Sequence, residues 1–188
     1  MPLLTACLLA PMLALSGIAH AAGPATQPVA TTPDYVISDV RVQTIAGFTF
    51  LYDSTRTSFQ AMSEPVERTI AAMEKAITEG KIHPSGPLVF VYRDLKDPNQ
   101  PFTLDVGFGV PDDTAAFGNY QVRKVEPFKC ATVLFSGPLA KVPEAYNKLM
   151  GALPALNLKP TTTVREFYLY WETPDSQNNI VQIQVGVQ

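Results

Sequence analysis

The chain has 188 residues, a formal net charge of −3 and a hydrophobic content of 46%, which suits one ordinary domain with a packed core. It contains no run of lysine or arginine. We therefore expect neither a nucleic-acid surface nor a polybasic membrane patch, because both need clustered positive charge.

The N-terminal segment differs from the rest of the chain. Residues 3–21 are apolar and then small, and they end in Ala-His-Ala. This pattern predicts a secretory signal peptide over residues 1–21, and hence a periplasmic or secreted protein. Cys7, in the tetrapeptide Leu-Thr-Ala-Cys, leaves lipidation open as an alternative. Pro11 and Gly17 interrupt the apolar run, so no stable membrane insertion is expected after cleavage.

Residues 22–34 are rich in Ala, Pro and Thr and predict a flexible tether, so one domain is expected over residues 35–188. After cleavage of the signal, only Cys130 and His83 remain of their residue types. They are too few for a disulfide or a His/Cys metal cluster, and we expect no metal and no cofactor. Cys130 is predicted to be a small core residue.

The predicted elements follow in chain order. Strands are expected over residues 41–52, 87–94, 102–110, 129–136, 163–171 and 180–187, because β-branched and aromatic residues are concentrated there. Helices are expected over residues 63–80 and 142–153. Apolar residues recur in each at helical spacing, and a proline stands near each start.

The order is strand, helix, strand, strand, and it occurs twice. Residues 90–110 can be aligned with residues 168–187, so that Tyr92 matches Tyr170 and Gly109 matches Gly186. We therefore predict an α+β fold of two β-α-β-β units, with a curved antiparallel sheet and two helices on one face.

Alternation along the strands separates two sets of side chains. In residues 163–171, one face carries Val164, Glu166, Tyr168 and Tyr170, and the other carries Arg165, Phe167, Leu169 and Trp171. The matching strand adds Leu88, Phe90 and Tyr92 to the first face. We expect the aliphatic set to lie under the helices. The aromatic set should then form an open groove with one acid, next to the small and polar positions of residues 102–110 and 180–187.

The segments GPLVFVYRD (86–94), LDVGFGVP (104–111), FSGPL (135–139) and REFYLYWETP (165–174) resemble the GyrI-like small-molecule-binding family. That family includes the effector-binding domains of AraC-type and MerR-type regulators. Its Gly-Pro before the second helix corresponds to Gly137-Pro138. Its acidic residue two before a tyrosine corresponds to Glu166 and Tyr168. This chain departs from the family at Leu139, where an aromatic residue is usual.

The resemblance implies a groove for small hydrophobic, often cationic, organic compounds. We expect the ligand-binding residues to be Glu166, Tyr168, Tyr170, Phe90, Tyr92 and, with less support from the pattern, Tyr52. Only a signal and a tether precede the domain, so an exported binding protein is expected rather than a DNA-binding regulator. The alternative is a hydrolase of strained, cyclopropane-containing electrophiles, in which Glu166 is the general base and Tyr168 orients or protonates the leaving atom.

Overall fold

The structure is a computed structural model that describes residues 34–188. The predicted signal peptide lies outside this part of the chain, and so does the predicted tether except for Asp34. Its strands are β1 (Val36–Ile37), β2 (Arg41–Ile45), β3 (Phe48–Thr57), β4 (Leu88–Arg93), β5 (Phe102–Val110), β6 (Gln121–Val125), β7 (Phe128–Ser136), β8 (Pro160–Tyr170) and β9 (Ile180–Val187). The helices are α1 (Ser63–Thr78) and α2 (Val142–Ala152), with short 3-10 turns at Leu139–Lys141 and Pro154–Leu156. No helix in the described residues is long and apolar enough to cross a membrane.

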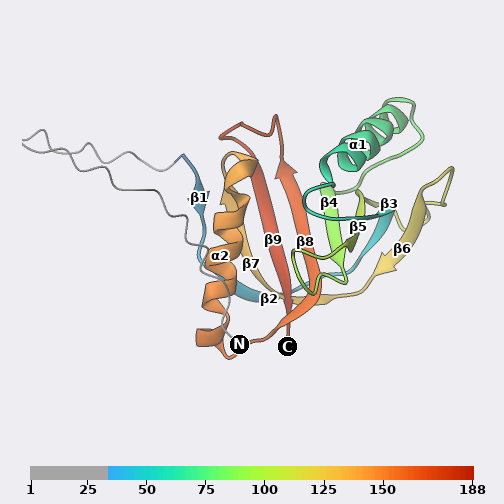
Figure 1. Ribbon diagram of the computed structural model, residues 1–188. Coiled ribbons are helices and arrows are strands. Elements are labelled where there is room, and N and C mark those ends of the chain that lie inside the picture. The colour runs from blue at the N-terminus through green and yellow to red at the C-terminus, as the bar shows by residue number, and fades with distance from the viewer. Residues whose placement is uncertain (1–33) are drawn as a thin grey trace, which may run out of the picture. The chain divides into compact units, whose positions relative to one another are not determined.

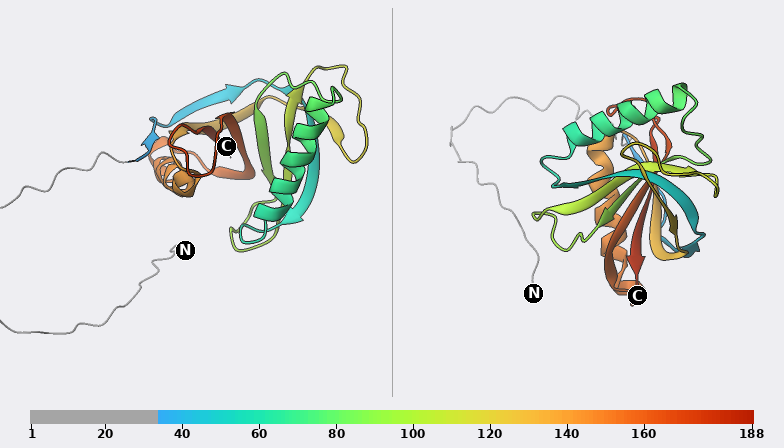
Figure 2. Two further views of the ribbon diagram at one scale, coloured as in Figure 1. Left: turned by 90° about the horizontal axis from the view of Figure 1, so that it is seen from above. Right: turned by 90° about the vertical axis from the view of Figure 1, so that its right-hand side faces the viewer.

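The predicted α+β fold with a duplicated unit is confirmed. β3-α1-β4-β5 forms the first unit and β7-α2-β8-β9 forms the second, in one antiparallel sheet of order β1-β7-β9-β8-β4-β5-β3-β6. The two units meet where β4 pairs with β8. In Figure 1, α2 lies beside the strands of the second unit and α1 beside those of the first, and the view from above shows the same division (Figure 2).

The two helices begin at the predicted residues and end two residues and one residue before the predicted ends. α1 carries the stripe Val66, Ile70 and Met73 toward the sheet, and Met73 is fully buried. It stops two residues before Gly80, whose φ of 70° is accessible to glycine at little cost. α2 has a proline in its first turn and buries Leu149.

The strand predicted over residues 41–52 is wrong in one respect, because the chain forms two strands there. β2 pairs with β7 at one edge of the sheet, while β3 pairs with β5 and β6 at the other. Gly47 lies at the break, where a Cβ atom would stand 2.4 Å from the carbonyl oxygen of Val125. The close approach of β6, itself not predicted, explains why glycine separates the two strands.

The pairing of β2 with β7 and of β3 with β6 also connects the two edges of the sheet. Arg41 pairs with Thr132 and Ile45 with Phe128, and the same register continues from Phe48 with Val125 to Tyr52 with Gln121. The chain segments 41–52 and 121–132 therefore run side by side across the sheet. The face of the sheet away from the helices is thus enclosed, and it holds a second apolar cluster of Phe50, Tyr52, Val89, Val91 and Val125.

As predicted, the aromatic residues of β4 and β8 share one face of the sheet. The prediction that the helices cover the aliphatic face is wrong, because they cover this aromatic face. Phe90 pairs with Glu166, and Leu88 with Tyr168, so the aromatic set does share one face. The hydroxyl of Tyr146, from α2, reaches Glu166, so this is also the face that carries the helices. Phe167 instead packs with the cluster on the opposite face. Leu169 and Trp171 are exposed.

The small and polar positions of β5 and β9 were also expected in the groove, and this is wrong. Val106 pairs with Phe90 and Ile183 with Glu166, so the aliphatic positions of these strands share the helix-covered face. Asp105 lies on the other face, where Arg93 and Arg123 contact its carboxylate at 2.8 Å each. The buried Asp105 is thus a paired structural charge.

Replacing Gly47 with alanine is expected to lower the free energy of unfolding by about 1–3 kcal/mol, because the added methyl group forces apart β3 and β6. Urea denaturation measures the change. Gly151→Ala in α2 is the control, because no atom lies within 4 Å of its added Cβ. That variant should gain about 0.5–1 kcal/mol from helix propensity. Equal stability of the Gly47→Ala and wild-type proteins would contradict the close approach.

Candidate functional site

A cavity of about 960 Å³ lies on the helix-covered face, large enough for a drug-sized molecule. Its floor comes from β4, β8 and β9, and its walls from α2, the segment before α1 and the loop after β4. The lining residues are Phe59, Met62, Tyr92, Leu95, Lys96, Pro98, Leu139, Val142, Pro143, Tyr146, Asn147, Met150, Pro160, Thr161, Thr162, Val164, Glu166, Tyr168 and Val185. Most are apolar, and among them Glu166 is the only acid and Lys96 the only base.

Glu166 is held in the floor of this cavity by three tyrosine hydroxyls. Tyr146 donates to Oε1 at 2.6 Å, while Tyr168 and Tyr92 donate to Oε2 at 2.9 and 3.0 Å. The donors come from α2, β8 and β4, so both repeats contribute. Glu166 is 4% exposed. A buried carboxylate without a cation partner needs such donors, because each replaces part of the hydration that was lost.

The titration of the four groups is coupled through this arrangement. Burial raises the pKa of Glu166, and the hydrogen bonds from Tyr146, Tyr168 and Tyr92 lower the pKa again without cancelling that rise. Burial, and then the negative charge of Glu166, raise the pKa of each tyrosine well above its usual value. The tyrosines therefore remain protonated donors. Of the four groups, Glu166 is therefore the one that changes its charge at the lowest pH.

The structure brings together three of the six predicted site residues. Glu166, Tyr168 and Tyr92 line the cavity. Phe90 is buried on the same face, and its ring packs 4.8 Å from that of Tyr168, so it supports that tyrosine from the side. Phe90 does not line the cavity and belongs to the apolar core of this face.

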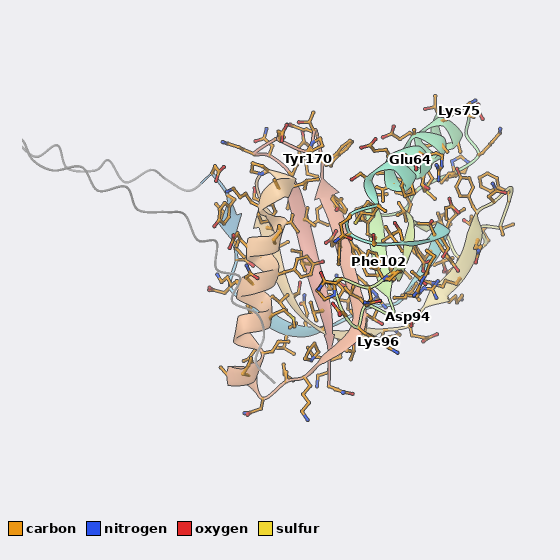
Figure 3. All side chains as sticks on the ribbon, viewed as in Figure 1. Glu64, Lys75, Asp94, Lys96, Phe102 and Tyr170 are labelled. Carbon is orange, nitrogen blue, oxygen red and sulfur yellow. The ribbon has the colours of Figure 1, made fainter. Side chains whose placement is uncertain are left out.

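The other two predicted residues lie elsewhere. Tyr170 follows a register shift in β8, is 50% exposed and donates its hydroxyl to Glu172 at 2.8 Å. Figure 3 shows it at the end of the strand. Tyr52 lies on the opposite face, where it donates to Gln121 and its ring packs under the guanidinium of Arg123. Alternation fails for Tyr170 because of the register shift. Tyr52 is the weaker candidate, predicted from its place in the first expected strand and not from alternation.

Sequence reasoning missed Tyr146 as a site residue, although it stands at helical spacing with Leu149 and Leu153 and is thus predicted to lie on the buried side of the second helix. A tyrosine in such a position needs a partner for its hydroxyl, and the single unexplained acid of the chain was the available one. Phe59 was also missed. Its ring packs 4.7 Å from Phe102 and 6.0 Å from Tyr92, which fixes one wall of the cavity.

Within the described residues, no group of three or more His, Cys, Asp and Glu side chains could hold a metal ion. Cys130 is fully buried, and burial raises the pKa of its thiol to about 11. The thiol is therefore poorly suited to act as a nucleophile.

Sequence comparison identifies the family of the chain. The model of the GyrI-like small molecule binding domain matches residues 38–188. The chain belongs to this family. The matched residues include every element that lines the cavity, from the segment before α1 to β9. No curated protein matches the chain in sequence.

Solved structures share the fold at low identity. The C-terminal domain of EcmrR has a TM-score of 0.66 and 17% identity over 80% of this chain and 97% of its own. In the complex of EcmrR with DNA, the same similarity covers 57% of the EcmrR chain. SAV2435, solved bound to tetraphenylphosphonium, has a TM-score of 0.55 and 13% identity over 80% of this chain and 94% of its own. A protein from Listeria innocua described as a hydrolase has a TM-score of 0.52 and 13% identity, over 80% of this chain and 92% of its own.

Replacing Tyr146 with phenylalanine removes one donor from the carboxylate but keeps the ring. We expect the pKa of Glu166 to rise further and the free energy of unfolding to fall by about 1–3 kcal/mol at neutral pH. The pKa of Glu166 is measured from its carboxyl ¹³C chemical shift during a pH titration. The free energy of unfolding is measured by urea denaturation. Tyr170→Phe is the matched control and should change neither. Equal effects of the two substitutions would contradict the assignment of Tyr146 to the site.

Proposed function

We propose that this GyrI-like domain binds hydrophobic organic cations, with the cationic centre next to Glu166 and the apolar groups against the cavity walls. One observation carries the proposal: a single buried carboxylate, held by three tyrosine hydroxyls, lies in the floor of a large apolar cavity. A delocalised cation costs less to transfer into such a site than a compact ion does. It would also place positive charge over the rings of Tyr92, Tyr146 and Tyr168, where cation–π attraction adds about 0.5–2 kcal/mol.

The walls favour a range of shapes over a single ligand. Met62 and Met150 face the cavity, and unbranched thioether side chains adapt to different surfaces. The structural neighbour solved with tetraphenylphosphonium supports this chemical class, since its fold is the same and its ligand is a bulky apolar cation.

Glu166→Gln tests the proposal, because it removes the charge while keeping nearly the same shape. The wild-type protein should bind tetraphenylphosphonium in isothermal titration calorimetry, and the variant should bind it at least about tenfold more weakly. The variant should unfold at the same temperature or higher, because a buried charge has been removed. Equal affinity in both proteins would refute the role of the carboxylate. Asp105→Asn is not a suitable control, since it breaks a paired charge.

The pH dependence follows from the raised pKa of Glu166. Because the folded protein holds this proton more tightly than the unfolded chain does, the contribution of Glu166 protonation to stability is complete at low pH. It is lost as the pH rises from the unfolded pKa through the folded one. A cation binds the ionised form, so its affinity should fall as the pH drops through the folded pKa. Titrations in buffers of different ionisation enthalpy should show proton release on binding near that pKa, and no release in Glu166→Gln.

Hydrolysis of strained electrophiles is the second candidate, and the raised pKa of a buried glutamate favours it. Three of the carboxylate's lone pairs accept from tyrosines, which leaves one for a water molecule. Glu166 would take a proton from that water, and Tyr168 would donate to the leaving atom. Product formation from a cyclopropane-containing electrophile, lost in Glu166→Gln, would establish the activity. Binding of the compound without any product would exclude it as a substrate.

Export completes the proposal and rests on the sequence of residues 1–21, outside the described residues. Under this proposal, a small organic molecule is the partner, and the domain does not contact nucleic acid. N-terminal sequencing of protein recovered from outside the cytoplasm should begin at residue 22. An intact N-terminus in a cytoplasmic fraction would refute export.

A further inference from the structure

The cavity contains a second charge that cation binding does not use. Lys96 lines it from the loop after β4, together with Leu95 and Pro98. Its ammonium group forms no ion pair or side-chain hydrogen bond with any described residue, although Asp94 and Asp97 stand beside it in sequence. Asp97 is engaged with Asn99 at 2.8 Å.

Lys96 and Glu166 lie toward different ends of the cavity. β4 and β8 are antiparallel, with Phe90 opposite Glu166 and Tyr92 opposite Val164. The chain leaves β4 in the direction away from Glu166, and the amide of Leu95 donates to the carbonyl of Thr162 at 3.3 Å. Roughly 13 Å of strand separates the Cα atoms of Thr162 and Glu166, at about 3.3 Å per residue. Figure 3 shows Lys96 at the far end of these strands from Tyr170.

The surroundings of Lys96 also differ from those of Glu166. Thr162, which accepts the backbone hydrogen bond of Leu95, lines the cavity beside the loop that carries Lys96. The three tyrosine hydroxyls contact Glu166, and none of them contacts Lys96. Lys96 adds three donors that can meet an anionic oxygen.

We propose that the ligand has two polar ends: a cationic group at Glu166 and an anionic oxygen group, such as a carboxylate, at Lys96, joined by an apolar body. This inference rests on the proposed function and narrows it from hydrophobic cations in general to elongated apolar zwitterions. A simple cation would leave Lys96 without a partner and would be repelled weakly by it. A molecule with a carboxylate at the far end would meet both charges of the cavity and cover the apolar surface between them.

The test uses triphenylphosphonium ions with alkyl tails of increasing length, each paired with the compound of equal length that ends in a carboxylate. In the wild-type protein we expect the carboxylate to tighten binding by about fivefold at the length that spans the cavity, and little at shorter lengths. This advantage should fall as the ionic strength rises, because Lys96 is exposed.

Lys96→Met should abolish the advantage of the carboxylate while binding of the alkyl series stays equal or tightens. Lys96→Arg should keep the advantage, since the charge is retained. Lys75→Met is the matched control: Lys75 is an exposed lysine of α1, outside the cavity, and its loss should change neither series.

The outcomes separate this inference from the proposed function. If the alkyl series binds and depends on Glu166, but the carboxylates bind no better or keep their advantage in Lys96→Met, the zwitterion proposal is refuted and cation binding stands. If neither series binds, the proposed function is refuted, and the inference with it.

Discussion

The burial of the Glu166 carboxylate is the constraint on which the site depends. An isolated carboxylate loses several kcal/mol of hydration when it is buried, and no cationic side chain of the described residues contacts it. Its partners are three neutral hydroxyls, one from each of α2, β8 and β4. The carboxylate is therefore stable only when α2 is docked and the two repeats are joined. The site therefore forms only when the fold itself is complete.

The sheet keeps this negative charge apart from the positive ones. Arg165 is next to Glu166 in the chain, but alternation sends it to the opposite face, where its guanidinium stacks 3.8 Å from the ring of Phe128. Burial lowers the pKa of Arg165 to about 10. On the same face, Arg93 and Arg123 form ion pairs with Asp105. Because the neighbouring cations lie across the sheet, none of them pairs with the carboxylate of Glu166.

The sequence predicted which side chains share a face, and it could not predict which face the helices cover. Alternation and the internal repeat correctly placed Glu166, Tyr168, Phe90 and Tyr92 together, since these depend only on local geometry and on one strand pairing. The position of the helices depends on long-range packing, and the aliphatic face of β8 was a misleading guide. That face is covered instead by segments 41–52 and 121–132, whose continuous pairing no local pattern reveals.

The duplication also explains why the site has one acid. Leu88 is the counterpart of Glu166 in the first repeat, and it pairs directly with Tyr168. A second carboxylate there would lie on the same face as Glu166 and one strand away, so the two charges would repel in a medium of low dielectric constant. The three hydroxyls can satisfy one carboxylate, and two would have to share them. Leucine at position 88 therefore allows a symmetric scaffold to hold one stable charge, and it gives the cavity a polarity that a strictly two-fold pocket would lack. A guest that binds through that charge has one preferred orientation, set by the repeat that carries the acid.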